Sequence, residues 1–181
     1  MYTVAQNPYG GLVTKADFKR GKGATPGTAA ANNIAGDTKQ YVAVKLASGT
    51  WINGTVLQID TANGSAVAAA PASAPSSVVN ARVGILVFAS ATATQTMAGT
   101  AYGWAQVYGQ ALARTTGAVA TPAIQLVQGN DPGELITGAQ VASGESQLDG
   151  ITAIATQAAS GLLNVFLNYP RFRGVPDQNL A

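Results

Sequence analysis

The chain has 181 residues and a formal net charge of +2, and it contains neither histidine nor cysteine. The length fits a single domain. The missing residue types exclude disulfides, thiolate or histidine-ligated zinc, and catalysis by Ser–His–Asp or Cys–His groups. Charged residues make up only 10% of the chain, against roughly 25% in an ordinary soluble domain. So few charged residues indicate that much of the protein surface is covered in an assembly. The alternative is a monomer whose surface is polar but uncharged.

The same composition limits the partners. A net charge of +2 is too small to imply nucleic acid by itself. No apolar run reaches the roughly 20 residues that span a bilayer, and the first residues lack the basic and apolar blocks of a signal peptide. We therefore expect no nucleic-acid partner and no membrane, in a protein made in a cytoplasm.

Residues 1–37 have no sustained periodicity and are rich in glycine and proline, which disfavours helix. They predict an extended N-terminal arm with room for short strands, and an unordered N-terminus is the alternative. Basic residues gather there around one aromatic ring: Lys15, Phe18, Lys19, Arg20 and Lys22. This cluster suits an acidic protein surface, and single-stranded nucleic acid is the less favoured partner.

Short stretches of alternating or continuous apolar residues follow, separated by turn signals about every 8–12 residues, as in all-β proteins. The predicted strands are 40–46, 51–60, 65–69, 82–89, 101–113, 118–121, 124–127, 134–142, 150–157 and 162–168. Gly54 is expected to be a bulge, Asn63-Gly64 is a hairpin signal, and residues 90–100 are expected to form a linker. The predicted fold is an all-β antiparallel barrel or sandwich, jelly-roll or tulip-like. The expected segments are an arm over 1–37, a body over 38–170 and a tail over 171–181.

The segment 101–113, reading AYGWAQVYGQALA, is the clearest strand. Tyr102, Trp104 and Tyr108 fall on one parity, and small residues fall on the other, which predicts one bulky face and one smooth face. Glycine and alanine on the smooth face allow another backbone to come close. The smooth face is expected to pack on the strand 82–89, while the aromatic face either fills the barrel or meets a neighbouring subunit.

No motif carries catalysis. Asp131 and Glu134 lie three residues apart in a GNDPGE turn, where they are more typical of turn chemistry than of a glycosidase pair. Glu145 and Asp149 are more typical of solvated loop charges than of a cation site. The glycine-rich segment 21–28 lacks the spacing of a phosphate-binding loop. We expect no catalytic residue, no cofactor and no metal.

The sequence pattern YGWAQVYG at 102–109, followed by Ala111, the turn TGAV at 116–119 and Thr121-Pro122, resembles that of small head proteins of tailed bacteriophages. These are capsid decoration, or cement, proteins, and the pattern over 151–167 is similar to theirs too. The resemblance covers about residues 80–170. It implies a β-rich virion protein, often a homotrimer, that binds the major capsid protein on the capsid exterior and resists internal pressure. It assigns no binding residue individually.

Aromatic and arginine side chains are the usual anchors of a protein interface. The residues expected to contact the capsid or a neighbouring subunit are Lys15, Phe18, Lys19, Arg20, Lys22, Trp51, Trp104, Tyr108, Arg171, Phe172 and Arg173. For Trp104 a place in the core is the alternative. A second hypothesis is a carbohydrate- or receptor-binding module on a head fibre or tail appendage, in which Trp51 and Trp104 stack on sugar rings. A third is a carboxylate-based hydrolase that uses Asp131 and Glu134.

Overall fold

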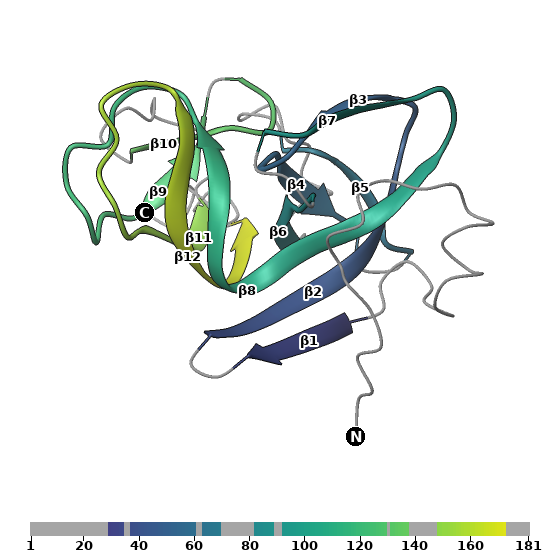
Figure 1. Cartoon of the computed structure of the whole chain (residues 1–181), viewed down its shortest axis with the longest axis horizontal. Coiled ribbons are helices and arrows are strands. Elements are labelled where there is room, and N and C mark those ends of the chain that lie inside the picture. The colour runs from purple at the N-terminus through teal and green to yellow at the C-terminus, as the bar shows by residue number, and fades with distance from the viewer. Residues whose placement is uncertain are drawn as a thin grey trace, which may run out of the picture.

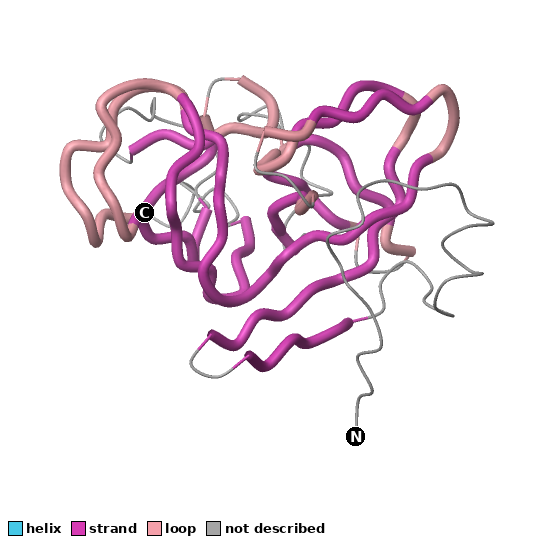
Figure 2. The backbone as a smooth tube through the Cα atoms, in the orientation of Figure 1, coloured by secondary structure: helices cyan, strands magenta, loops and turns pink. Residues whose placement is uncertain are grey.

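The computed structural model describes residues 29–34, 37–60, 63–69, 82–88, 92–129, 131–137 and 148–172. Within these ranges the chain is all-β, as predicted, and no described residue lies in a helix (Figures 1 and 2). The strands are β1 Ala29–Ile34, β2 Asp37–Leu46, β3 Gly49–Ile52, β4 Val56–Ile59, β5 Ser65–Ala68, β6 Arg82–Leu86, β7 Thr94–Met97, β8 Ala101–Thr115, β9 Leu126–Gln128, β10 Leu135–Thr137, β11 Leu148–Ala153 and β12 Gly161–Phe172. Most pairs are antiparallel, and β2–β5 and β8–β10 are parallel.

The first half of the sheet closes on itself. The pairings run from β2 to β5, β4, β6 and β8, and β8 then pairs with β2. The turn between β4 and β5 carries Gly64 at φ +70°, whose amide donates to the carbonyl of Asp60. This confirms the turn predicted from Asn63-Gly64. The five paired strands together form a small closed barrel.

The interior of this barrel is the first core. Alternate residues of β2, β4 and β8 point into it, because successive side chains of a strand leave on opposite faces. The first core consists of Val42, Val44, Leu46, Leu57, Ile59, Ala66, Leu86, Phe88, Ala101, Ala105 and Val107.

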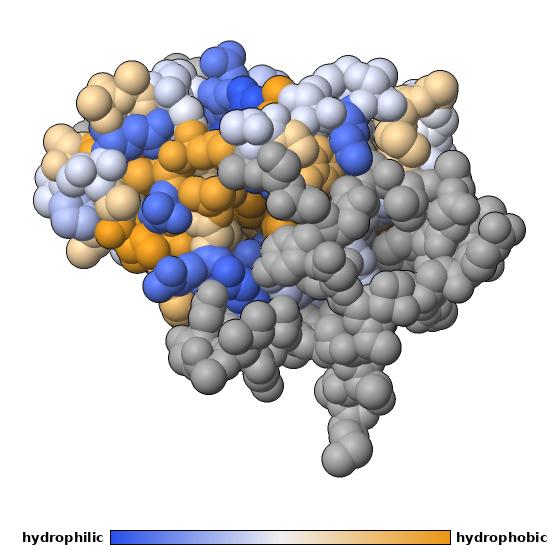
Figure 3. Space-filling view, viewed as in Figure 1, coloured by the Kyte–Doolittle hydropathy of each residue, from blue (hydrophilic) through white to orange (hydrophobic). Residues whose placement is uncertain are grey.

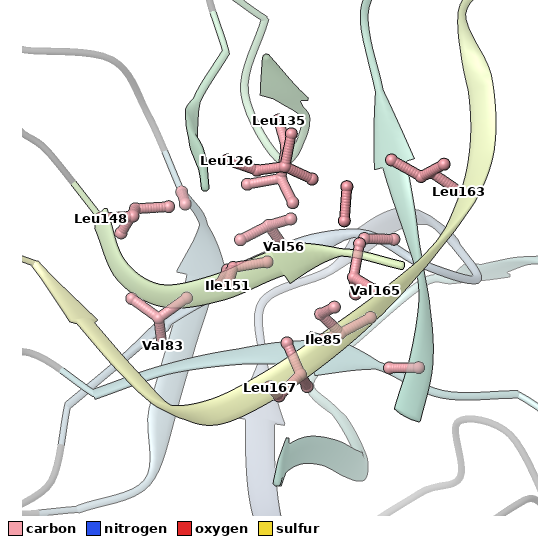
Figure 4. Close-up of a cluster of buried hydrophobic side chains, with 14 of the residues drawn as sticks. Val56, Val83, Ile85, Leu126, Leu135, Leu148, Ile151, Leu163, Val165 and Leu167 are labelled. Atoms are coloured by element: carbon pink, nitrogen blue, oxygen red, sulfur yellow. The ribbon is translucent and has the colours of Figure 1, made fainter. Parts of the chain in front are cut away.

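A second closed arrangement follows along the chain. β8 pairs with β12 and β12 with β11, a bridge joins Thr152 to Gln125 just before β9, and β9 and β10 return to β8. Its side chains converge as the second core (Figure 4). The second core consists of Val56, Ala69, Val83, Ile85, Ala111, Ala113, Val119, Leu126, Leu135, Leu148, Ile151, Ala153, Leu163, Val165 and Leu167.

The two cores share a wall made of β4 and β6. Val56 faces the second core and its neighbour Leu57 faces the first. In β6, Ile85 likewise faces the second core and Leu86 faces the first. Both faces of this strand pair are therefore buried, which explains why the sequence over 82–88 reads as continuously apolar.

Strand β8 runs through both halves of the molecule (Figure 1). Its first part pairs with β2 and its last part with β12. The register with β2 shifts by one residue at Val107, and Gly109 has φ +89°. This bulge bends the strand, so the small parity lines the first core with Ala105 and the second core with Ala111. The aromatic parity faces outward from both cores.

Three local expectations were wrong. The predicted strand 118–121 is absent from the described structure, where Val119 forms only an isolated bridge with Gln157. The predicted strand 51–60 is interrupted by the Asn53–Thr55 turn, where Gly54 has φ +83° and lies against β8. The predicted linker 90–100 contains β7, which pairs with β3 in a separate two-stranded sheet. Thr94, Thr96 and Met97 show why: β-branched residues favour an extended chain, and Met97 packs against the first core.

Both predicted segment boundaries, 37/38 and 170/171, fall within strands. β1 lies within the expected arm and pairs with β2 along its length. β12 continues to Phe172, two residues past the expected end of the body. The described part of the chain has no helix with the length and apolar character needed to cross a membrane.

Candidate functional site

The outer face of β8 and β12 is the candidate site. In register, Asn168 lies opposite Tyr108, Phe166 opposite Gln110, and Asn164 opposite Leu112. The intervening residues of β12, Val165 among them, are buried in the second core. The outer face therefore mixes amides with aromatic rings.

Three aromatic rings cluster on this face. Tyr108 meets Phe166 edge to face, with ring centroids 5.6 Å apart, and Tyr169 at a 30° tilt, with centroids 5.0 Å apart. Phe166 is 36% exposed and Tyr169 is 47% exposed. Ile154, at the end of β11, is also exposed, and its amide donates to the carbonyl of Asn164. We call Tyr108, Ile154, Phe166 and Tyr169 the aromatic patch.

The patch is an unusual concentration of exposed apolar surface. Among the described residues, the large exposed hydrophobic side chains are Val67, Ile154, Phe166 and Tyr169, and three of these belong to it. In the space-filling view, hydrophobic residues gather over the half of the molecule that contains β9–β12 (Figure 3). Contiguous exposed apolar surface is characteristic of an interaction site.

Tyr169 also has a strained backbone. Its φ is +47°, in the left-handed region that side chains other than glycine rarely adopt. The strand continues through the buried Pro170 to the exposed Arg171. Strain of this kind costs of order 1 kcal/mol and persists where the surrounding structure imposes it, often at functional sites.

A cavity of about 380 Å³ opens beside the patch, where the bend of β8 meets the end of β6. Its polar lining comes from Lys39, Asn53, Gln106, Gln110 and Asn164. Its apolar lining comes from Leu86, Val87, Phe88, Ala111 and Leu112. The Asn53–Thr55 turn positions one wall, because the side-chain oxygen of Asn53 accepts from the amide of Phe88 at 2.7 Å.

Gln106 is the most buried polar residue of this lining, at 3% exposed. Its side-chain nitrogen donates to the carbonyl of Tyr108 at 3.0 Å and to that of Gln110 at 2.7 Å. These two bonds hold the bent backbone of β8 from both sides of Gly109. They also fix the orientation of the amide, because only the NH₂ group can donate to carbonyls.

A separate polar cluster surrounds Glu134. Arg114 donates to one carboxylate oxygen through Nε, at 3.0 Å, and through Nη2. Thr116 donates its hydroxyl to the other oxygen. Burial alone would raise the pKa of Glu134, but the bonds from Thr116 and Arg114 and the arginine charge together lower it below the usual 4.5. Both oxygens of Glu134 are thus held by structural partners, while Asp131 is exposed.

The two tryptophans do not lie together on one exposed surface. Trp51 is half-buried, packs against the first core, and donates its indole N–H to the carbonyl of Ala47 at 3.2 Å. Trp104 is half-buried and packs against Tyr102 and Ala43. Both therefore have packing roles in the described structure.

Of the other expected contact residues, Tyr108 lies in the aromatic patch and Arg171 is exposed on β12. Phe172 ends β12, and only its backbone is described. Lys15, Phe18, Lys19, Arg20, Lys22 and Arg173 lie outside the described residues.

The sequence reasoning missed Phe166, Tyr169, Gln106 and the cavity. A signal for Phe166 was present, because Asn164 and Asn168 share its parity in LLNVFLN while leucine and valine occupy the other. An aromatic ring on the polar parity of a strand indicates exposure. No such signal exists for the cavity, since its lining comes from five separate segments of the chain.

In the described ranges, no three carboxylates gather in a way that could hold a metal ion. A comparison of the chain with protein-family models finds no match. A comparison with curated proteins finds none either.

Proposed function

We propose that the protein is a structural virion protein, a capsid decoration protein that binds the outer capsid lattice of a tailed bacteriophage as a homotrimer and stabilises the head. The support comes from the sequence resemblance over 80–170, from the low charge of the chain, and above all from the aromatic patch. This function requires a rigid body and a contact surface, with no catalytic group.

The aromatic patch is the observation on which the proposal rests. Binding energy at protein interfaces concentrates in a few aromatic and arginine residues surrounded by weaker contacts. Tyr108, Phe166 and Tyr169 form such a cluster, and the exposed Arg171 follows on the same strand. The patch sits on paired strands, so its rings are presented by a rigid part of the fold.

The test is binding to empty capsids. The double variant Phe166→Ala/Tyr169→Ala is expected to lower capsid affinity by about 100-fold, in line with the loss of two anchor residues. Val67→Ala is the matched control, because Val67 is 55% exposed on β5, outside the patch. Equal occupancy of the two variants, with unchanged circular dichroism spectra, would contradict the role of the patch.

The basic arm is tested on the same capsids. Deletion of residues 1–28 removes Lys15, Lys19, Arg20 and Lys22 and retains β1, which pairs with β2. We expect weaker binding with a smaller salt dependence, because fewer charges are then attracted to an acidic capsid surface. Unaltered binding by the truncated chain would remove the arm from the proposed interface. Light scattering, expected to give three chain masses, tests the trimer separately.

A second candidate function is a carbohydrate- or receptor-binding module on a head fibre or tail appendage. The cavity next to the aromatic patch favours it, because its lining combines amides with apolar side chains. The tryptophans expected to stack on sugars contribute less, since Trp51 and Trp104 are both half-buried.

A further inference from the structure

We propose that the cavity at the bend of β8 binds one neutral sugar unit, with the side-chain oxygen of Gln106 accepting a hydrogen bond from a sugar hydroxyl. This inference goes beyond capsid decoration, and it gives the second candidate function a specific site. It rests on the chemistry and burial of the cavity lining.

The first argument is that the side-chain oxygen of Gln106 lacks a hydrogen-bond donor within the described structure. The side-chain nitrogen of Gln106 uses its hydrogens on the carbonyls of Tyr108 and Gln110. Among the described residues, no donor reaches the side-chain oxygen of Gln106, although the residue is only 3% exposed and lines the cavity. This oxygen is therefore available to accept a hydrogen bond, and a ligand hydroxyl in the cavity would supply the donor.

The second argument is the character of the remaining polar lining. Gln110 and Asn164 contribute exposed amides, each of which can donate and accept. A hydroxyl group also does both, so amides suit polyhydroxylated ligands. The half-buried Val87 and Leu112 add apolar surface, which suits the C–H face of a sugar ring. The lining thus matches a molecule with both hydroxyls and apolar faces.

The third argument concerns charge and size. Among the described residues of the lining, Lys39 is the only charged one and none is a carboxylate, which disfavours a cationic ligand. Lys39 has an interaction partner within the structure, so the cavity need not supply one for it. A volume of about 380 Å³ is at the small end of ligand pockets, which suits a single sugar unit.

The experiment is titration of the full ¹⁵N-labelled chain with D-glucose, D-galactose or N-acetyl-D-glucosamine, followed by NMR. At about 10 mM sugar, enough for a millimolar site, we expect saturable shifts of the side-chain NH₂ signals of Gln106 and Asn164. Absence of saturable shifts with all three sugars would overturn the proposal. Tighter binding of glucuronate than of glucose would overturn the assignment to a neutral ligand.

Variants locate the site. Gln106 supports the β8 backbone, so its replacement risks the fold, and the exposed Gln110 and Asn164 are better targets. Gln110→Ala/Asn164→Ala is expected to weaken sugar binding about tenfold or more, from the loss of two hydrogen bonds. Asn168→Ala is the matched control, because Asn168 is an exposed asparagine on the same strand that does not line the cavity. Equal affinities of these variants would place any sugar binding elsewhere.

The outcome is independent of capsid binding. Phe166→Ala/Tyr169→Ala tests the aromatic patch on capsids, whereas the amide variants test the cavity with free sugars. Failure of one assay therefore leaves the other proposal standing.

Discussion

At Glu134, one carboxylate joins two segments that are distant in sequence. Its partners Arg114 and Thr116 lie at the end of β8, and Glu134 itself precedes β10, which pairs in parallel with β8. A parallel pair cannot be joined by a short hairpin, so side-chain contacts help to fix its register. We interpret the Glu134 cluster as a clamp on that pairing.

The clamp predicts a pH dependence of stability. The pKa of Glu134 is lower in the folded protein than its usual 4.5, so the ionised form is favoured by folding. The resulting stability is complete at neutral pH, above the pKa of the unfolded chain, and is lost as the pH falls through the folded pKa. Glu134→Gln is expected to lower the free energy of unfolding by about 1–3 kcal/mol at pH 7, with the difference shrinking toward pH 3.

Urea unfolding between those pH values measures this effect. Asp131→Asn is the control, since Asp131 lies in the same turn but is exposed, and it should change stability by less than about 0.5 kcal/mol. A deficit of Glu134→Gln that stays constant with pH would show that ionisation of this carboxyl does not stabilise the fold.

Single residues also show what the sequence could and could not reveal. The parity of Tyr108 in β8 placed it on the aromatic face and left open whether that face fills the barrel or meets a neighbouring subunit; in the structure Tyr108 is half-buried in the aromatic patch. Trp51 is expected at an interface because tryptophan is a common anchor, and in the structure it is half-buried in a short strand and packs against the first core. Which of two apolar residues is buried depends on what other segments cover it, and parity within one strand does not contain that information.

At the scale of elements, β8 and β6 lie unusually close together. Ala105 is paired with Leu86, which lies two residues after Gly84 on β6. A Cβ on Gly84 would lie 3.0 Å from the Cβ of Ala105 and 3.1 Å from Cδ1 of Ile59. The smooth parity of β8 was expected to pack on this strand; β6 is instead a hydrogen-bonded neighbour of β8 in the same sheet, and Ala105 of the smooth parity lies close to Gly84.

Gly84→Ala is therefore expected to destabilise the protein by about 1–3 kcal/mol, as overpacked cores do. Gly99→Ala is the matched substitution, because no described atom lies within 4 Å of a Cβ added there. It should change stability by less than about 0.5 kcal/mol. Thermal and urea unfolding of both variants measure the difference, and equal stabilities would mean that the wall relaxes without cost.

The strands were largely predictable because most of them alternate or are continuously apolar. Their neighbours were not, because pairing depends on the closure of the sheet. The β8 bend illustrates this limit: YGWAQVYGQ predicts one long strand with two faces, and nothing in its period indicates that one face lines two cores in succession. β7 was missed because TQTM has small amphipathic contrast and acquires its burial from the first core.

At the scale of the whole molecule, the two cores share the β4–β6 wall, so neither is complete without the other. Leu57→Ala removes packing from the first core and Ile85→Ala from the second. Both residues are fully buried, and each change is expected to cost about 2–5 kcal/mol. We expect one unfolding transition in both variants, shifted to lower temperature, because loss of either core exposes the wall of the other.

Calorimetry alongside near- and far-ultraviolet circular dichroism tests this cooperativity. Coincident transitions with equal calorimetric and van't Hoff enthalpies are the expected result. Two separate transitions, with only one moved by each substitution, would show that the halves are independent domains.

The shared wall also affects how the chain is made. During synthesis from the N-terminus, the first barrel has all its strands once Thr115 has left the ribosome, but Val56, Val83 and Ile85 then face water. They stay uncovered until the segments up to β12 emerge, and exposed apolar surface of this kind promotes aggregation. Emergence of β12, and not closure of the first barrel, is thus the step that allows this apolar surface to be covered.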